Sequence, residues 1–249
     1  MKDTDRDEAW LLKEKYHGEQ TPEFHTDCLR LNAGEPLAYV IGFVPFLNCT
    51  IWLDSKPLIP RVETEFWTVF CLRTSATARM LKPKILDLCA GSGCIGVALA
   101  KELPTALVTF LDIETAHAET ITKNCQGNGI AAERFAISVG NLFAPLKEDA
   151  KFNLIVANPP YIDKNLHRTE TSVTTYEPHA ALFSAESGFS HLRTIILGAA
   201  AHLEPRGELW LEHEPEHVAL IQEAASTHFQ VNTQPDQFGR LRFTQLVLQ

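Results

Sequence analysis

Short apolar segments that alternate with helical stretches are the feature of this 249-residue chain that most constrains its fold. Strand-like runs near residues 84–88, 106–111, 134–139 and 152–157 are separated by helix-like stretches near 94–103 and 114–126. Apolar strands that alternate with helices form right-handed βαβ units, which predicts a parallel sheet. Ligands of such sheets bind where the carboxyl ends of the strands open, so the functional site is expected there.

A glycine turn follows the first of these strands. Gly91, Gly93 and Gly96 spell the GxGxxG pattern, which is a weak signal by itself, and its alternative interpretation is a tight turn without a ligand. Asp112 ends the next apolar strand, 21 residues after Gly91, at the spacing of a carboxylate that binds ribose hydroxyls. NAD and S-adenosylmethionine share this ribose, so the spacing does not distinguish between them.

The charge of Asp87 distinguishes the two cofactors. This acid lies at the loop-side end of the first strand. A carboxylate there would repel a pyrophosphate, whereas it can bind the ammonium group of a methionine moiety. The sequence therefore favours S-adenosylmethionine as the cofactor.

The tetrapeptide Asn158-Pro159-Pro160-Tyr161 directly follows the buried-strand run 152–157. Two prolines lack N–H groups and push Asn158 toward an extended conformation, so the local backbone offers carbonyl acceptors. The Asn158 side chain adds an acceptor and two donors, and the Tyr161 ring is expected to stack over a flat group as a lid. We interpret the segment as a cradle for a planar amide or an exocyclic base amine.

Together, segments 86–93 and 158–161 resemble the HemK/PrmC family, which comprises S-adenosylmethionine-dependent methyltransferases acting on the side-chain amide of glutamine. Three further stretches, 34–42 (GEPLAYVIG), 58–65 (LIPRVETE) and 176–183 (YEPHAALF), are similar to the same family. Asn-Pro-Pro-Tyr also occurs in adenine-N6 methyltransferases, so the Pro-Arg-x-Glu-Thr-Glu and Tyr-Glu-Pro blocks are what narrow the resemblance. It covers the chain from about residue 30 to the C-terminus.

The resemblance implies an α/β fold, that of a Rossmann-like class I methyltransferase with a seven-stranded, mostly parallel sheet whose last strand is antiparallel. It also implies a small helical domain over residues 1–42, shorter than is usual in the family, a hairpin linker over 43–61 and a catalytic domain over 62–249. The catalytic residues would be Asn158, Pro159, Pro160 and Tyr161. The residues binding S-adenosylmethionine would be Asp87, Cys89, Ala90, Gly91, Ser92, Gly93, Asp112, Ile113, Asn141, Leu142 and Asn158. The implied substrate is the Gly-Gly-Gln motif of peptide chain release factors, with a ribosomal-protein glutamine as the alternative.

Three residues depart from the family pattern: Cys89 replaces a usual Gly, Val62 a usual Pro and Asn141 a usual Asp. None of them removes a required group. Asn141 can still accept a hydrogen bond from an adenine amine, although a neutral acceptor is weaker than an ionised one.

Composition favours a protein substrate over a nucleic acid. The formal net charge of −9 opposes binding to phosphates, so an adenine-N6 methyltransferase acting on DNA or RNA is the less favoured alternative, and no sequence-specific nucleic-acid binding is expected. An NAD-dependent oxidoreductase or a noncatalytic nucleotide-binding module would leave the Asn-Pro-Pro-Tyr segment unexplained. Six scattered cysteines and a polar N-terminus without an apolar signal core predict a cytoplasmic protein, and no apolar run is long enough to span a bilayer.

The segment His213 to His217 matches the zinc motif H-E-x-x-H. The motif requires both histidines on one face of a helix, whereas Pro215 marks the first turn after a strand. We therefore predict no metal site.

Overall fold

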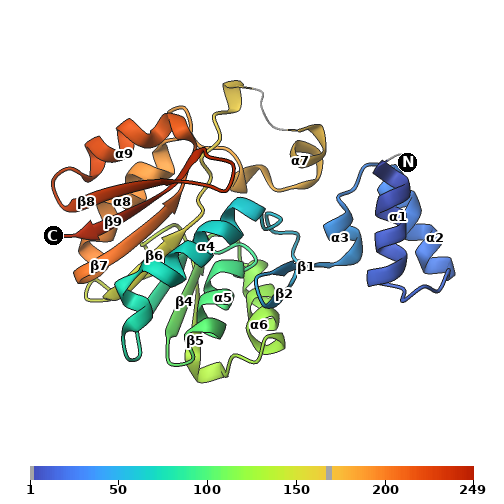
Figure 1. Ribbon diagram of the computed structural model, residues 1–249, viewed down its shortest axis with the longest axis horizontal. Coiled ribbons are helices and arrows are strands. Elements are labelled where there is room, and N and C mark those ends of the chain that lie inside the picture. The colour runs from blue at the N-terminus through green and yellow to red at the C-terminus, as the bar shows by residue number, and fades with distance from the viewer. Residues whose placement is uncertain (1–2, 167–169) are drawn as a thin grey trace.

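A seven-stranded sheet forms the centre of the computed structural model, which describes residues 3–166 and 170–249 (Figure 1). The strands are β3 (Lys84–Leu88), β4 (Leu107–Asp112), β5 (Phe135–Val139), β6 (Phe152–Ala157), β7 (Leu203–Glu212), β8 (Phe229–Pro235) and β9 (Leu241–Leu248), in the order β5-β4-β3-β6-β7-β9-β8. Strands β3 to β7 pair in parallel, and β9 is antiparallel to both β7 and β8. The predicted mostly parallel sheet with an antiparallel last strand is confirmed.

Helices cover both faces of this sheet (Figure 1). Helices α4 (Val62–Thr74), α5 (Cys94–Glu102) and α6 (His117–Gly127) pack on one face, while α8 (Ser190–His202) and α9 (Val218–Ala225) pack on the other. The side chains of a strand alternate between the two faces, so Ile85 joins the α4–α6 side and Leu86 the α8–α9 side. This two-sided burial explains why the central strands β3 and β6 are largely apolar runs.

The register of the sheet brings three strand ends together. Leu88 pairs with Leu111 of β4 on one side and with Ala157 of β6 on the other. The residues that follow these partners, Asp112 and Asn158, therefore flank the glycine turn after β3. Because the chain continues from β3 to one side and later returns to β6 on the other, this point is the topological switch where open α/β sheets bind ligands.

A separate helical part precedes the sheet and consists of α1 (Asp3–Glu14), α2 (Pro22–Asn32) and α3 (Leu37–Ile41) (Figure 1). Thr21 is the N-cap of α2, and its hydroxyl accepts from the Phe24 N–H at 3.2 Å. The three helices enclose their own small apolar cluster around Leu11 and Leu31. The predicted hairpin follows as β1 (Phe43–Phe46) and β2 (Cys49–Trp52). Residues 1 and 2 of the predicted helical domain lie outside the described residues.

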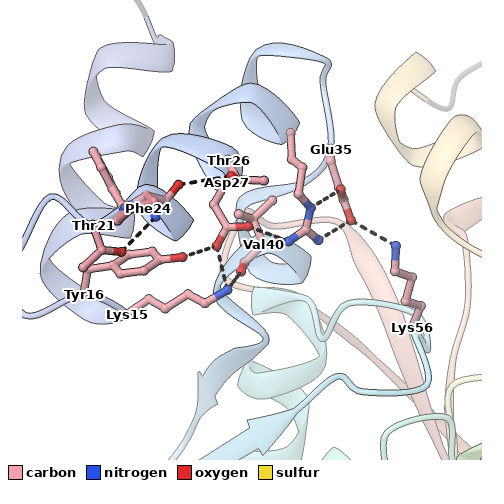
Figure 2. A network of polar contacts seen from close by, with 11 residues as sticks. Lys15, Tyr16, Thr21, Phe24, Thr26, Asp27, Glu35, Val40 and Lys56 are labelled. Carbon is pink, nitrogen blue, oxygen red and sulfur yellow. Dashed lines mark hydrogen bonds and ion pairs between the residues drawn. The ribbon is translucent and has the colours of Figure 1, made fainter.

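A chain of ion pairs joins the helical part to the segment after β2 (Figure 2). Lys15 and Arg30 bind the two oxygens of Asp27 at 2.7 and 2.8 Å. Arg30 also makes a bidentate pair with Glu35, and Lys56 binds the same carboxylate at 3.0 Å. The guanidinium of Arg30 lowers the pKa of Glu35 to about 2. The position of the helical part is therefore fixed by charge as well as by packing.

The sequence predicts one helix over residues 62–80, and this prediction is wrong at Ser75. Helix α4 ends at Thr74, because Ser75 adopts an extended conformation and its hydroxyl accepts from the Thr77 N–H. A short 3-10 turn, η1 (Ala76–Arg79), follows. The competing side-chain hydrogen bond is the usual reason why serine interrupts a helix.

The remaining elements are short and lie mostly between β6 and α9. They are η2 (Ala132–Arg134), η3 (Lys164–Leu166), α7 (Thr171–Tyr176), η4 (His179–Ala181) and η5 (Pro215–His217). Within the described ranges, no helix combines the length and the apolar character that crossing a membrane requires.

Candidate active site

The turn between β3 and α5 presents its backbone to a cavity. Cys89, Gly91 and Gly93 all have positive φ values, of 58°, 55° and 76°, which fold the chain back sharply above the sheet. Gly96 serves packing instead, since a Cβ atom there would lie 2.3 Å from the ring of Phe110. The glycines of the pattern thus have two roles, in turning the chain and in bringing α5 close to β4.

Asp112 fixes this turn. One carboxylate oxygen accepts from the Gly91 N–H at 2.7 Å and the other accepts from the Glu114 N–H at 2.9 Å. A carboxylate has about four lone-pair positions, so each oxygen keeps capacity for a further donor. Asp112 also lines the cavity, where it can accept from a pair of ribose hydroxyls.

The cavity above the turn, called the glycine-loop cavity here, has a volume of about 290 Å³. Most of the residues predicted to bind the cofactor line it together, namely Cys89, Ala90, Gly91, Ser92, Asp112, Ile113, Asn141, Leu142 and Asn158. Asn141 is exposed at its wall. Pro160, predicted to be catalytic, lines this cavity too.

Two predicted cofactor residues, Asp87 and Gly93, do not line this cavity. Asp87 is fully buried beneath the turn, where one oxygen accepts from the Gly96 N–H at 2.8 Å. Its other oxygen, Oδ1, has no hydrogen-bond partner among the described residues. Burial, with a smaller contribution from Asp112, raises the pKa of Asp87 from 3.8 to about 8. The structure thus places an acid with a raised pKa directly behind the cavity wall.

A second cavity, of about 390 Å³, lies on the other side of Asn158 and is called the cradle cavity here. Pro159 and Tyr161 line it, together with the salt-bridging Arg61. Asn158 lines both cavities, as do Leu58 and Ala181. The tetrapeptide predicted to be catalytic is therefore the partition between two neighbouring spaces.

Tyr161 is held by its hydroxyl, which donates to Oε1 of Glu212 at 2.7 Å. Burial and the neighbouring Glu212 raise the pKa of Tyr161 well above its usual range. The ring packs partly against the apolar core and partly lines the cradle cavity. Its predicted role as a stacking lid remains a prediction, with the hydroxyl anchored inside the protein.

Sequence reasoning assigned no role to Thr64, Trp67 or Glu212. Glu212 ends β7 and is 1% exposed, and it accepts hydrogen bonds from Thr64 at 2.6 Å and Trp67 at 2.7 Å. The Asn158 side-chain nitrogen donates to the Thr64 hydroxyl at 3.1 Å. The sequence does contain a signal for this role, since Glu212 directly follows the apolar run Leu209-Trp210-Leu211. A carboxylate buried at the end of such a strand needs hydrogen-bond donors around it.

The histidines of the H-E-x-x-H segment bind different protein groups. His213 is buried and faces the Thr244 hydroxyl at 2.8 Å, and burial lowers its pKa to about 4. His217 instead faces the Ser187 carbonyl at 3.0 Å. Pro215 begins the short turn η5, as the sequence predicted.

Comparison with known proteins identifies the chain's relatives. The family model "Methyltransferase small domain" matches residues 69–177. Release factor glutamine methyltransferase of Vibrio cholerae is 37% identical over 184 residues, an alignment that covers 74% of this chain and 63% of the relative. The protein of the same name from Aliivibrio fischeri is 32% identical over 229 residues, which cover 91% of this chain and 78% of the relative.

Solved structures agree on the fold. A methyltransferase from Pyrococcus furiosus superposes with a TM-score of 0.58 at 16% identity, covering 88% of this chain and 96% of that structure. The predicted class I methyltransferase fold is thereby confirmed. Alignments to the Vibrio cholerae and Francisella tularensis relatives span only 63% and 64% of those proteins, whereas the Aliivibrio fischeri relative is covered over more than two thirds of its length. The chain belongs to the release factor glutamine methyltransferase family.

Proposed function

We propose that this chain transfers a methyl group from S-adenosylmethionine to the side-chain amide nitrogen of a protein glutamine. The observation that carries the proposal is the position of Asn158, which lines the glycine-loop cavity and the cradle cavity at once. A methyl donor and a methyl acceptor must approach one another closely, and two adjoining cavities with a shared polar residue fit that requirement.

The residues present fit S-adenosylmethionine. Asp112 has acceptor capacity left for ribose hydroxyls, and the uncovered backbone of Gly91 allows close approach. Ile113 and Leu142 would hold the adenine by apolar contact, with Asn141 as acceptor for its amine. When bound, the cofactor supplies a methyl group made electrophilic by the sulfonium charge.

The contribution of the protein is orientation. An amide nitrogen is a poor nucleophile because its lone pair is delocalised into the carbonyl group. The Asn158 side-chain oxygen and the Pro159 carbonyl would accept the two amide hydrogens of the glutamine and so fix the nitrogen. These hydrogen bonds strengthen as the nitrogen gains positive character, so they act selectively in the transition state. The released proton would pass to water.

We further propose the Gly-Gly-Gln motif of peptide chain release factors as the substrate. The names of the relatives support it, and the net charge of −9 makes a nucleic-acid substrate less suitable. We also propose a cytoplasmic location, which fits the finding that none of the six cysteines, all within the described residues, forms a disulfide. We also propose that the chain divides into a helical domain over residues 1–42, a hairpin linker over 43–61 and a catalytic domain over 62–249. The separate apolar cluster of the helical part supports this division.

Incubation of the purified chain with labelled S-adenosylmethionine and a release factor tests the proposal. We expect mass spectrometry to find one added methyl group on the glutamine of the Gly-Gly-Gln peptide, and none when that glutamine is replaced by alanine. A ribosomal-protein extract and an adenine-containing oligonucleotide serve as parallel substrates. Methylation of either in preference to the release factor would overturn the substrate proposal, and calorimetric binding of NAD instead of S-adenosylmethionine would overturn the cofactor.

A further inference from the structure

We infer that Glu212 and Thr64 are positioning residues that fix which end of the Asn158 side-chain amide, the oxygen or the NH2 group, is presented to the substrate. The inference deepens the proposed function and rests on it. It follows from the number of protons that can be donated within one buried hydrogen-bond network. This network joins β7, α4 and the segment 158–161.

Glu212 is brought to the cradle by the register of the sheet. Ala157 pairs with Leu211, so the next residues of the two strands, Asn158 and Glu212, leave the sheet side by side. The alternation along β7 turns Glu212 toward α4, where Trp67 is fully buried and Thr64 is 1% exposed. A carboxylate thus lies between the helix and the candidate catalytic residue.

All the partners of this carboxylate are donors. Its Oε2 atom accepts from the Thr64 hydroxyl at 2.6 Å and from the Trp67 indole N–H at 2.7 Å. Its Oε1 atom accepts from the Tyr161 hydroxyl at 2.7 Å. A threonine hydroxyl has a single proton, and Glu212 uses it. Toward any other group, Thr64 can therefore only accept.

That restriction determines the orientation of Asn158. The atom of its amide that lies 3.1 Å from the Thr64 hydroxyl must be the NH2 group, because a carbonyl there would face an acceptor. The side-chain oxygen then points away from Thr64, free to accept from a substrate amide. An asparagine in the opposite orientation would present donors to the donors of the substrate.

The orientation does not depend on the ionisation of Glu212. Burial raises the pKa of this carboxyl, and the bonds from Thr64, Tyr161 and Trp67 oppose the rise. A proton on Oε1 would face the Tyr161 hydroxyl, which can accept it. Oε2 would remain an acceptor for Thr64, so the Asn158 amide would keep its orientation.

A second glutamate on the same face of β7 shows the contrast. Glu208 is also buried and accepts three hydrogen bonds, from the Ala76 N–H, the Trp210 indole and the Gln245 amide. None of these three hydrogen bonds involves Asn158 or its partner Thr64. Glu208 therefore supports the fold alone, while Glu212 has the additional role at the site.

Thr64→Val tests the inference, because it keeps the shape of the side chain and removes both the acceptor for Asn158 and the proton donated to Glu212. With no partner for the NH2 group, the amide is expected to turn its donors toward the cavity, since an unpaired N–H costs more than an unpaired carbonyl. We expect kcat to fall about tenfold, with KM for the substrate and Kd for S-adenosylmethionine changed less than about threefold. Thr64→Ser restores the hydroxyl and should restore kcat to within about threefold of the wild type.

Thr68→Val is the matched control. Thr68 is equally buried one turn further along α4, and its hydroxyl bonds the Thr64 carbonyl rather than Glu212. We expect kcat of this variant to stay within about twofold of the wild type, because its hydroxyl contributes to the helix alone. A loss equal to that of Thr64→Val would overturn the inference, since both changes would then act through general loosening of α4.

A double-mutant cycle tests whether Thr64 acts through Asn158. In an Asn158→Ala background, Thr64→Val should lower the residual kcat less than about twofold, because the group that it orients is already absent. The same tenfold loss in both backgrounds would overturn the inference.

Exchange of the Asn158 side-chain amide protons gives a readout that needs no substrate. Their NMR signals can be assigned by their absence in Asn158→Ala. We expect them to exchange slowly in the wild type and at least about tenfold faster in Thr64→Val, because one hydrogen bond is lost. Unchanged exchange would overturn the positioning role. A wild type that methylates no glutamine but shows the exchange difference would refute the proposed function alone.

Discussion

The two cavities that meet at Asn158 are built in different ways. The glycine-loop cavity is formed mainly by consecutive residues at strand ends, such as the turn 89–92 and Asp112, and its shape is set by backbone hydrogen bonds. Asn158, which both cavities share, is held by side chains far apart in sequence: its partner Thr64 lies 94 residues away and lines the glycine-loop cavity, and Thr64 is bonded to Glu212, 148 residues away. The glycine turn is a local motif, whereas the setting of Asn158 is a product of tertiary packing.

This difference separates two kinds of mutational effect. Contacts in the glycine-loop cavity serve a group that is bound before and during the reaction, so their loss should appear in cofactor affinity. Contacts in the cradle should be strongest in the transition state, so their loss should appear in kcat. The predictions below test whether the two halves of the site can be separated in this way.

The largest effect is expected for Asn158→Ala. Removal of a preorganised acceptor from a transition state should lower kcat roughly 100-fold, while Kd for S-adenosylmethionine changes only modestly. Steady-state kinetics with a release factor and calorimetry with the cofactor give the two numbers. Asn153→Ala, near the opposite end of β6, is the control, because the Asn153 side-chain oxygen accepts from the Lys84 backbone N–H and the residue lines neither cavity.

Asn158→Asp sharpens the same comparison. The change keeps the size and an acceptor oxygen but adds a negative charge and removes the donors to Thr64. Partial activity would support the role of the side-chain oxygen as an acceptor. Wild-type kcat in the alanine variant would instead show that Asn158 does not hold the reacting nitrogen.

An intermediate effect is expected for Asp112→Ala. The ribose hydroxyls would lose a charge-assisted partner worth about 1.5–3 kcal/mol, so Kd for S-adenosylmethionine should rise roughly 10- to 100-fold. At saturating cofactor, kcat should fall less than threefold if contacts in the glycine-loop cavity affect cofactor affinity alone. Asp54→Ala is a suitable control, because that carboxylate pairs with Lys123 at the surface. Cofactor binding that does not change in Asp112→Ala would remove the ribose assignment.

The contrast between the cavities also explains what could be predicted from the sequence. The neighbourhood of Asp112 and Asn158 was predictable, because parallel strands end at one edge of a sheet and both residues directly follow apolar strands. The break at Ser75 was not predicted, because it depends on a hydroxyl that competes for one backbone N–H in an otherwise helical stretch. The tie from Thr64 to Glu212 could not be predicted, since no local pattern relates residues so far apart.

Asp87 lies on the predicted strand, but its side chain points beneath the glycine turn. Side chains alternate along β3, and Ile85 packs on the α4–α6 side of the sheet. Asp87 shares that face, so its carboxylate lies beneath the turn, bonded to the Gly96 N–H, rather than in the cavity. The alternation was readable from the sequence, whereas the burial that raises the pKa of Asp87 required the packed helix α5.

The smallest effect concerns the proton on Asp87, whose cofactor role remains a prediction. Its pKa of about 8 lies above the unfolded value of 3.8. Between these pH values, the folded protein without cofactor therefore holds a proton on Asp87 that the unfolded chain has lost. Stability is therefore lost progressively as the pH rises from about 4 to about 8, and Asp87→Asn should remove that dependence.

If the cofactor's ammonium group is bound by this carboxylate, the new positive charge will lower its pKa and expel the proton. We expect binding of S-adenosylmethionine at pH 7 to release roughly half to one proton, measured by calorimetry in buffers of different ionisation enthalpy. Asp87→Asn should release essentially none. Equal proton release by both proteins would assign the ammonium to another partner and leave Asp87 as a packing residue beneath the turn.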